Sequence, residues 1–120
     1  MEPNRYINVL FKAPNKNPKI VRIENALDDM QELIHGPLDI MFYKGAFLVC
    51  NKYRGTQNLE PNLSLENKMI LGSFFIVGDD EKTADFISLS RKQIRKFTKG
   101  ILISMDRQKE ILDELECELE

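Results

Sequence analysis

The stretch Ile70-Leu-Gly-Ser-Phe-Phe-Ile-Val-Gly-Asp-Asp80 decides the fold, because it predicts a strand, a turn and a returning strand. We expect one strand over residues 69–77, rich in the β-branched and aromatic residues that strands favour. Gly78-Asp-Asp80 is turn chemistry. It predicts that the chain turns back into a further strand over residues 84–89.

Four segments nearer the N-terminus predict two hairpins. Residues 6–11 and 19–24 are expected strands, and the prolines and asparagines of residues 13–18 predict the turn between them. Residues 38–43 and 46–50 are a second pair of expected strands. Lys44-Gly45 between them predicts a two-residue hairpin turn.

Residues 25–37 predict a short helix. Asn25 is the expected N-cap, with Asp28 placed as in a capping box. Gly36 is expected to end the helix by adopting a left-handed conformation, and Pro37 by lacking a backbone donor. Residues at helical spacing form one expected apolar face, namely Leu27, Met30, Leu33 and Ile34.

The last third of the chain predicts two more helices. Ser90 and Gln93 form a capping-box pattern that opens a basic helix to about residue 98, and Gly100 is expected to end it. Ser104 is the expected cap of a final helix. Its apolar residues, at heptad-like spacing, are Met105, Leu112, Leu115 and Leu119. Together, the expected strands and helices predict an α+β fold. It is a mainly antiparallel sheet of about five to six strands with one internal helix and two C-terminal helices.

Composition narrows the class of protein. The chain has 120 residues, 42% hydrophobic and 30% charged, which predicts one globular domain over residues 1–120. Residues 6–98 form the expected α+β core and residues 100–120 an acidic C-terminal helix.

A net charge of −2 gives no general attraction to nucleic acid or anionic lipid. No apolar run is long enough to span a bilayer, and the start of the chain lacks a secretory pattern, so we expect a cytoplasmic protein. Cys50 and Cys117 are too few for a disulfide framework and are expected to be reduced thiols.

Several of these segments resemble a small family known only as a domain of unknown function. The sharpest matches are residues 23–27, 30–33, 61–62, 74–80 and 86–89, within a likeness that covers about residues 6–98. The chain departs from the family pattern at His35, where a glycine is common, and at Leu63, where a basic residue is common. Members are found in phages, prophages, conjugative plasmids and their Gram-positive hosts. The resemblance therefore implies a mobile genetic element as the context and offers no activity to carry over.

No catalytic, cofactor or metal motif is visible. His35 has a side chain suited to general base catalysis or metal ligation, but its place at the end of a helix favours a structural role. The acidic residues of 78–81, with Asp85, offer oxygen ligands for a divalent cation, but the same residues are what a tight turn requires. We expect no metal, no cofactor and no enzyme activity.

The polar segment of residues 51–67 is the first candidate surface. It offers an aromatic stacking face, a guanidinium and three amides, a set suited to a nucleotide or a protein partner. The simpler alternative is a solvated connection. The candidate ligand-binding residues are Tyr53, Arg54, Gln57, Asn58 and Asn62.

The second candidate surface is the split charge of the C-terminal third. Residues 91–99 contain no acid, and a basic helix suits phosphate contact; the candidate cluster is Arg91, Lys92, Arg95 and Lys96. Residues 106–120 carry seven acids against Arg107 and Lys109. They suit a basic groove of another protein; the candidate partner-binding residues are Asp113, Glu114, Glu116 and Glu118. Two alternatives stay open for the charges: the basic and acidic helices partly neutralise each other, or both are solvated faces. The leucine stripe, formed by Leu112, Leu115 and Leu119, is expected either to pack in the core or to form a dimer contact.

These observations predict a non-enzymatic accessory protein of a phage or mobile element that acts by binding in the host cytosol. One version inhibits a host immune effector protein through the acidic helix, in the manner of an anti-CRISPR protein. Another sequesters the nucleotide signal of such an effector through Tyr53, Arg54 and the basic cluster. The alternatives are a small regulator of phage or plasmid gene expression and an enzyme of unidentified class. Direct nucleic-acid binding and the choice between monomer and homodimer stay open, and no membrane contact is expected.

Overall fold

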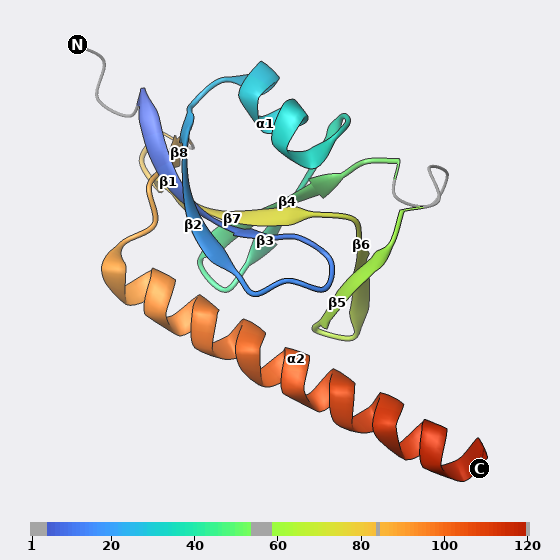
Figure 1. Cartoon of the computed structure of the whole chain (residues 1–120). Coiled ribbons are helices and arrows are strands. Elements are labelled where there is room, and N and C mark those ends of the chain that lie inside the picture. Colours follow the sequence, from blue (N-terminus) through green and yellow to red (C-terminus); the bar gives the residue numbers. More distant parts are fainter. Residues whose placement is uncertain (1–4, 54–58, 84, 120) are drawn as a thin grey trace.

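The computed structural model describes residues 5–53, 59–83 and 85–119, and for residues 116–119 the backbone only. Figure 1 shows the arrangement: strands gathered into a twisted sheet, with a short helix on one side and a long helix crossing the other. The elements in chain order are β1 (Tyr6–Lys12), β2 (Lys19–Glu24), α1 (Leu27–Ile34), β3 (Leu38–Tyr43), β4 (Ala46–Asn51), β5 (Pro61–Leu65), β6 (Lys68–Leu71), β7 (Phe74–Asp79), β8 (Phe86–Ile87) and α2 (Arg91–Leu119).

The main sheet has six strands, and every pairing in it is antiparallel. Its order is β2-β1-β7-β4-β3, and β8 pairs with the end of β7 beyond the point where β1 leaves it. β5 and β6 form a separate two-stranded hairpin. The predicted α+β class and mainly antiparallel sheet are confirmed.

β7 lies at the centre of the main sheet, and its alternating side chains build two cores. Phe74 and Ile76 pack in the core beneath α2, together with Phe97 from that helix. Phe75 and Val77 point to the opposite face, into the core that contains residues of α1. Alternation along a strand thus gives each helix its own apolar floor.

Helix α1 packs with Met30 and Ile34 buried, as its spacing predicts, but its ends differ from the prediction. Ala26 occupies the N-cap position without a side-chain bond, because the Asn25 amide instead donates to the Phe86 carbonyl oxygen of β8 at 3.1 Å. Leu27, expected on the apolar face, is the first residue of the helix and is exposed.

The left-handed residue at the end of α1 is His35 rather than Gly36. The backbone φ of His35 is 67°, and its side chain is exposed. Gly36 is needed for a different reason, because an added Cβ would lie 2.6 Å from the amide nitrogen of Asn51. The Asn51 amide donates to the His35 carbonyl oxygen, which fixes the exit from the helix against β4.

The hairpin turn at Lys44-Gly45 is confirmed, with positive φ at both residues as a type I′ turn requires. The single strand predicted over residues 69–77 is wrong. Gly72 has a φ of 76° and bends the chain out of β6 before β7 begins. β7 then continues through Asp79, so the turn comes later than predicted and the returning strand shrinks to β8.

Residues 51–68, expected to be irregular, contain strand β5. Its sequence, Pro-Asn-Leu-Ser-Leu, has weak strand character by itself. Burial of Leu63 and Leu65 in the core beneath α2 supplies the missing stabilisation. The hydrophobic residue at position 63 is therefore a packing residue in this chain.

The two predicted C-terminal helices are one helix of 29 residues. The capping box is present, since the Gln93 N–H donates to Ser90 Oγ at 3.1 Å and the Ser90 N–H to Gln93 Oε1 at 3.0 Å. Gly100 does not end the helix, because a glycine in a helix interior costs only about 1 kcal/mol, less than packing of Phe97 and Ile101 provides. Ser104, expected to be a cap, lies inside the helix.

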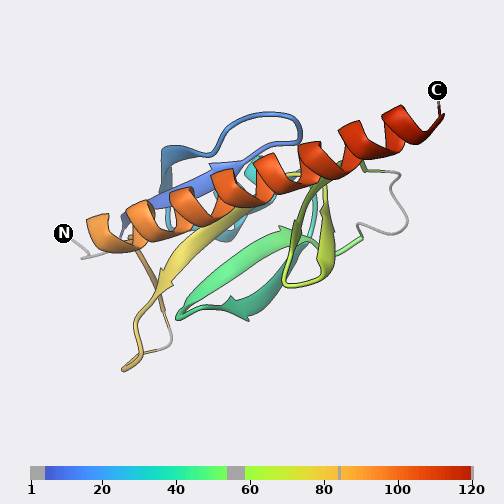
Figure 2. The same cartoon turned by 90° about the horizontal axis from the view of Figure 1, so that it is seen from below.

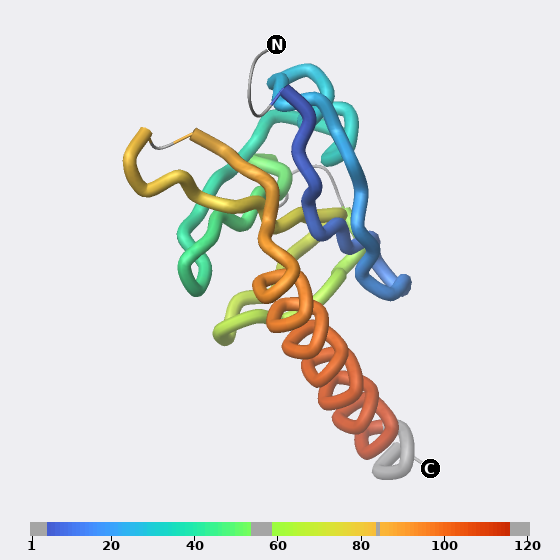
Figure 3. Tube along the Cα trace, turned by 90° about the vertical axis from the view of Figure 1, so that its left-hand side faces the viewer, coloured from blue at the N-terminus to red at the C-terminus, as the bar shows by residue number. Residues whose placement is uncertain are grey.

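α2 extends well past the sheet that it covers. A helix of this length spans about 43 Å, and the molecule measures 60 × 32 × 20 Å. Figure 2 shows the first half of α2 lying across the sheet, and Figure 3 shows its second half leading away from the body. No helix in the described part of the chain has both the length and the apolar character needed to cross a bilayer.

Candidate functional site

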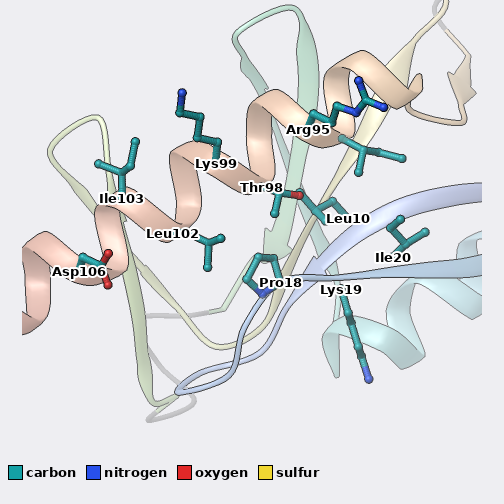
Figure 4. A pocket seen from close by; sticks show the side chains of 11 residues that line it. Leu10, Pro18, Lys19, Ile20, Arg95, Thr98, Lys99, Leu102, Ile103 and Asp106 are labelled. Atoms are coloured by element: carbon teal, nitrogen blue, oxygen red, sulfur yellow. The ribbon is translucent and has the colours of Figure 1, made fainter.

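A groove runs between α2 and the loop that joins β1 to β2. It has a volume of about 630 Å³ and a mostly apolar lining. In Figure 4, Leu10, Pro18, Thr98 and Leu102 face one another across it, whereas Lys99 points away. The remaining lining residues include Ile20 and Ile94 and the charged side chains of Lys19, Arg95 and Asp106.

A second, smaller cavity of about 180 Å³ lies farther along α2. This cavity lies under the middle of the helix, between Met105 and Leu112, and reaches Lys12 and Asn15 on the β1 side. We call the groove and this cavity together the trough. Its lining contains one acid, Asp106, and five cations: Lys12, Lys19, Arg95, Lys99 and Lys109. The trough is thus apolar at its floor and basic in charge.

A buried lysine sits at the inner end of the trough. The side chain of Lys12 is 1% exposed, and its Nζ donates to Asn62 Oδ1 at 2.8 Å and to the Ala13 carbonyl oxygen at 2.7 Å. Burial lowers the pKa of the Lys12 ammonium, because removal from water disfavours its charged form. Strand alternation places Lys12 on the same face as Leu10, which lines the groove.

Asn62, a predicted ligand-binding residue, holds β5 in place. Its Nδ2 donates to the Lys12 carbonyl oxygen at 2.9 Å and to the Gly72 carbonyl oxygen at 2.8 Å, while its Oδ1 accepts from Lys12. The side chain is buried. These bonds join β1, β5 and the bend after β6 beneath the middle of α2.

Of the other predicted ligand-binding residues of the first candidate surface, the structure describes Tyr53 alone. Tyr53 is exposed just after β4, and its backbone N–H donates to Asn51 Oδ1 at 2.8 Å. Arg54, Gln57 and Asn58 lie outside the described residues. Their proposed contact with a ligand stays a prediction.

The basic cluster lies on exposed positions of the first two turns of α2. Arg95 lines the groove, and Arg91 shares that flank because it precedes Arg95 by one helical turn. Lys92 and Lys96 lie on another side of the helix, where Lys96 Nζ is 5.6 Å from the ring centroid of Phe97. The structure therefore divides the cluster between two surfaces.

The second half of α2, residues 106–119, is named the overhang. Asp113 and Glu114 are exposed there, and the side chains of Glu116 and Glu118 lie outside the described part. Three large apolar side chains are also about half exposed: Ile111, Leu112 and Leu115. In the described chain, Gln108 is the last α2 residue seen to bond to another element, accepting from the Ser64 N–H at 3.3 Å.

The alternative metal and acid-base sites have structural explanations. Asp80 Oδ1 accepts the Lys82 N–H at 3.1 Å, and the Asp85 N–H donates to Thr83 Oγ1, so the acidic segment is bonded as a turn. Within residues 5–53, 59–83 and 85–119, no three side chains of His, Cys, Asp or Glu are grouped to hold a metal. Cys50 is buried on β4.

Sequence reasoning found the charges of α2 but missed the trough. Lys12 was not singled out, and Pro18 was expected only as part of a turn. The trough arises from the packing of one helix against a loop some 80 residues earlier in the chain, which no local pattern encodes. The position of Lys12 two residues after Leu10 was the one available indication that it faces the core.

Comparison with known proteins gives a family and no activity. No curated protein and no solved structure matches the chain. A family model described as a domain of unknown function, DUF3846, matches residues 7–102, which include the sheet, α1, the basic half of α2 and most of the groove lining. The chain therefore belongs to the DUF3846 family.

Proposed function

We propose that this protein acts by binding another macromolecule rather than by catalysis, and that the overhang of α2 makes the contact. One observation carries the proposal: the apolar stripe of α2 continues past the main sheet, where its large side chains are about half exposed. Phe97 and Ile101 are buried, whereas Leu112 and Leu115 are 54% and 50% exposed. Exposed apolar side chains gathered on one helix, with charges beside them, are typical of an interaction surface.

The charge of the overhang indicates what kind of partner fits. Residues 106–120 carry seven acids and two bases, so the overhang presents an apolar strip with acidic sides. A basic groove with an apolar floor on the partner is complementary to it. Charge of this kind speeds association and excludes partners of like charge.

The specific form of the proposal is an accessory protein of a phage or other mobile element that blocks a host immune effector in the cytosol. Its support is the complementarity of an acidic helix to the basic grooves with which nucleic-acid-guided or nucleic-acid-cutting proteins hold their substrates. The resemblance of residues 6–98 to proteins of mobile elements is its second support.

The experiment recovers the tagged full-length protein from its own host and weighs its complexes by native mass spectrometry. The test variant is Asp113→Lys/Glu114→Lys, which reverses two exposed acids of the overhang. The matched control is Asp28→Lys/Glu32→Lys, which makes the same change of charge on α1, across the sheet. Both pairs are on helices, so the two variants differ mainly in the surface that they change.

We expect a host polypeptide to be recovered with the unchanged protein and the α1 variant and to be lost with the overhang variant. Equal recovery with both variants would exclude the overhang as the contact. A bound small molecule of nucleotide mass, lost with Tyr53→Ala, would replace the proposal with the sequestering function. Tight binding to duplex DNA that weakens steeply with salt would favour a gene regulator instead.

A further inference from the structure

We propose that two copies of this chain pair antiparallel along α2, so that the acidic overhang of each lies in the basic trough of the other. The inference deepens the proposed function and rests on it for its biological meaning. In the free protein the second copy would cover the surface that a target later takes. The trough would then resemble the surface of the target.

The charges of α2 run against the helix dipole. The positive end of a helix dipole is its N-terminus, where acidic residues stabilise it, and cations stabilise the C-terminal end. α2 has no acid in its first turn and no base in its last turn, and the cations of its first turn, Arg91 and Lys92, lie where they cost stability. An antiparallel partner reverses this cost, because it brings an acidic C-terminal half beside each basic N-terminal half.

One flank of α2 has three large apolar side chains, Leu102, Met105 and Leu112, at positions that suit a helix pair. Positions 91, 95, 98, 102, 105, 109, 112 and 116 follow one another at alternating steps of four and three residues. This is the spacing that keeps one flank facing a partner helix along its whole length. Thr98 and Leu102 on this flank line the groove, and Met105, Lys109 and Leu112 line the smaller cavity. Part of this flank of α2 therefore lines the trough.

Reversing the order of residues along this flank sets its apolar centre against itself and its cationic end beside the acidic end of the partner. With the two-fold axis between Leu102 and Met105, Leu102 meets the partner's Met105 at the centre, beside the core of the partner chain against which that Met105 packs. Thr98 then lies level with Lys109, Arg95 with Leu112, and position 91 with position 116. Asp113 follows Leu112 in sequence and so lies close to Arg95, which places a cation and an acid together at each end. In a two-fold pair each of these contacts occurs twice.

The trough also supplies apolar cover for the overhang. Ile20 and Leu102 line the groove, and both are exposed in the single chain. Leu112, exposed on the overhang, comes level with Arg95 at the edge of the partner's groove. Apolar contact of this kind is expected to add to the charge pairing, because each exposed side chain leaves water on association.

A second copy fits the trough better than a nucleic acid does. The trough floor is apolar, which a phosphate backbone does not match, and the chain carries a net charge of −2. A strand lying in the trough would also meet the acidic overhang at one end, which repels phosphates. The overhang of a second copy has both required features, an apolar strip and acidic sides.

Sedimentation equilibrium over a range of protein concentrations tests the pairing. We expect the unchanged chain to reach twice its 14.0 kDa mass. Arg91→Glu/Arg95→Glu and Asp113→Lys/Glu116→Lys should each raise the dissociation constant of the dimer about 100-fold, because each reversal acts in both halves of the pair. Asp28→Lys/Glu32→Lys on α1 should leave the constant unchanged. Both test variants place charges where the helix dipole favours them, so they should not unfold α2.

Mixing the two test variants gives a sharper result. One variant has acids in both halves of α2 and the other has bases in both halves, so neither pairs well with itself. We expect the mixture to form a dimer of one chain of each kind. For orientation, Thr98→Cys and Lys109→Cys, made separately in a Cys117→Ser background, should give a disulfide between unlike chains. A parallel pair would instead join each variant to its own kind.

Three results would overturn the inference: a monomer at every concentration, a dimer that neither reversal weakens, or a cross-link pattern of the parallel kind. Binding of an oligonucleotide that is lost with Arg91→Glu/Arg95→Glu, in a protein that stays monomeric, would give the trough to a nucleic acid instead. The sedimentation result is separate from the recovery of a host polypeptide. A monomer that still captures its target would refute the pairing and leave the proposed function standing.

Discussion

The first half of α2 is covered by the sheet and the second half is not, although one apolar stripe runs along both. Ile101 is 1% exposed and packs among residues of β1, β4 and β7, while Leu112 on the same helix is 54% exposed. The two halves also carry opposite charge. The first half of α2 therefore belongs to the core of this chain, whereas large apolar side chains of the second half remain half exposed.

The largest expected effect lies in the covered half. Phe97→Ala should lower the free energy of unfolding by about 3–5 kcal/mol, because the buried ring leaves a cavity between α2 and the sheet. Its ring lies 5.7 Å from that of Tyr43, so the loss reaches the edge of the sheet. Urea denaturation followed by circular dichroism measures it. A loss below about 1 kcal/mol would mean that the first half of α2 is not anchored.

The next effect lies where the cover of α2 ends. Asn62→Ala should cost about 1–3 kcal/mol, because it leaves the buried Lys12 ammonium and two backbone carbonyls short of partners. Asn17→Ala, at an exposed position in the loop before β2, is the matched control and should be neutral. If the two variants unfold at the same urea concentration, Asn62 does not hold β5 beneath the helix.

Lys12 makes the same junction sensitive to pH. Burial lowers the pKa of Lys12 in the folded state, so the folded protein binds fewer protons than the unfolded chain between the lowered pKa and the usual value of about 10.4. Stability contributed at this site should therefore rise with pH through that window. The difference in unfolding free energy between the unchanged chain and Lys12→Met measures it. A difference that falls with rising pH would contradict the assignment.

Sequence patterns correctly predicted the turns and caps that are formed by residues close together in the chain. The Lys44-Gly45 turn and the capping box of Ser90 and Gln93 are formed by neighbours in sequence, and both are present. Asn25 was wrong as a cap: Ala26 takes the cap position, and the Asn25 side chain donates through Nδ2 to the Phe86 carbonyl oxygen, 61 residues away. β5 was missed because its stabilisation comes from burial in the core beneath α2, which depends on the assembled fold.

In the candidate site, too, some features could be predicted from the sequence and others depend on the assembled fold. The charges of Arg95 and Asp113 are visible in the sequence, and so is the leucine stripe. The sequence left open whether that stripe packs in the core or against a partner, and the exposure of Leu112 and Leu115 shows that the sheet of this chain does not cover them. The trough required Pro18 and Leu102 to meet across the fold, which spacing alone does not predict.

A smaller effect tests whether the two halves form one rigid helix. Gly100→Ala should raise the free energy of unfolding by about 0.5–1 kcal/mol, because alanine restricts the unfolded chain and favours helix. The position is exposed and an added Cβ would meet open space. If the chain instead bends at Gly100, the substitution should be neutral or destabilising. Thermal unfolding at several protein concentrations measures the effect.

The smallest expected effect belongs to the uncovered half, and it separates the two explanations of the stripe. In dilute protein, where single chains dominate, Leu112→Ala should change the free energy of unfolding by about 0.5 kcal/mol or less, as surface substitutions do. If two copies pair along α2, the unchanged chain gains stability as its concentration rises, because only folded chains form the dimer. The gap between the two proteins should then widen with concentration. Leu33→Ala provides the contrast, because Leu33 on α1 is half-buried against the core of its own chain and its loss should be the same at every concentration. A gap for Leu112→Ala that is equally constant would mean that the stripe of the overhang awaits a different partner.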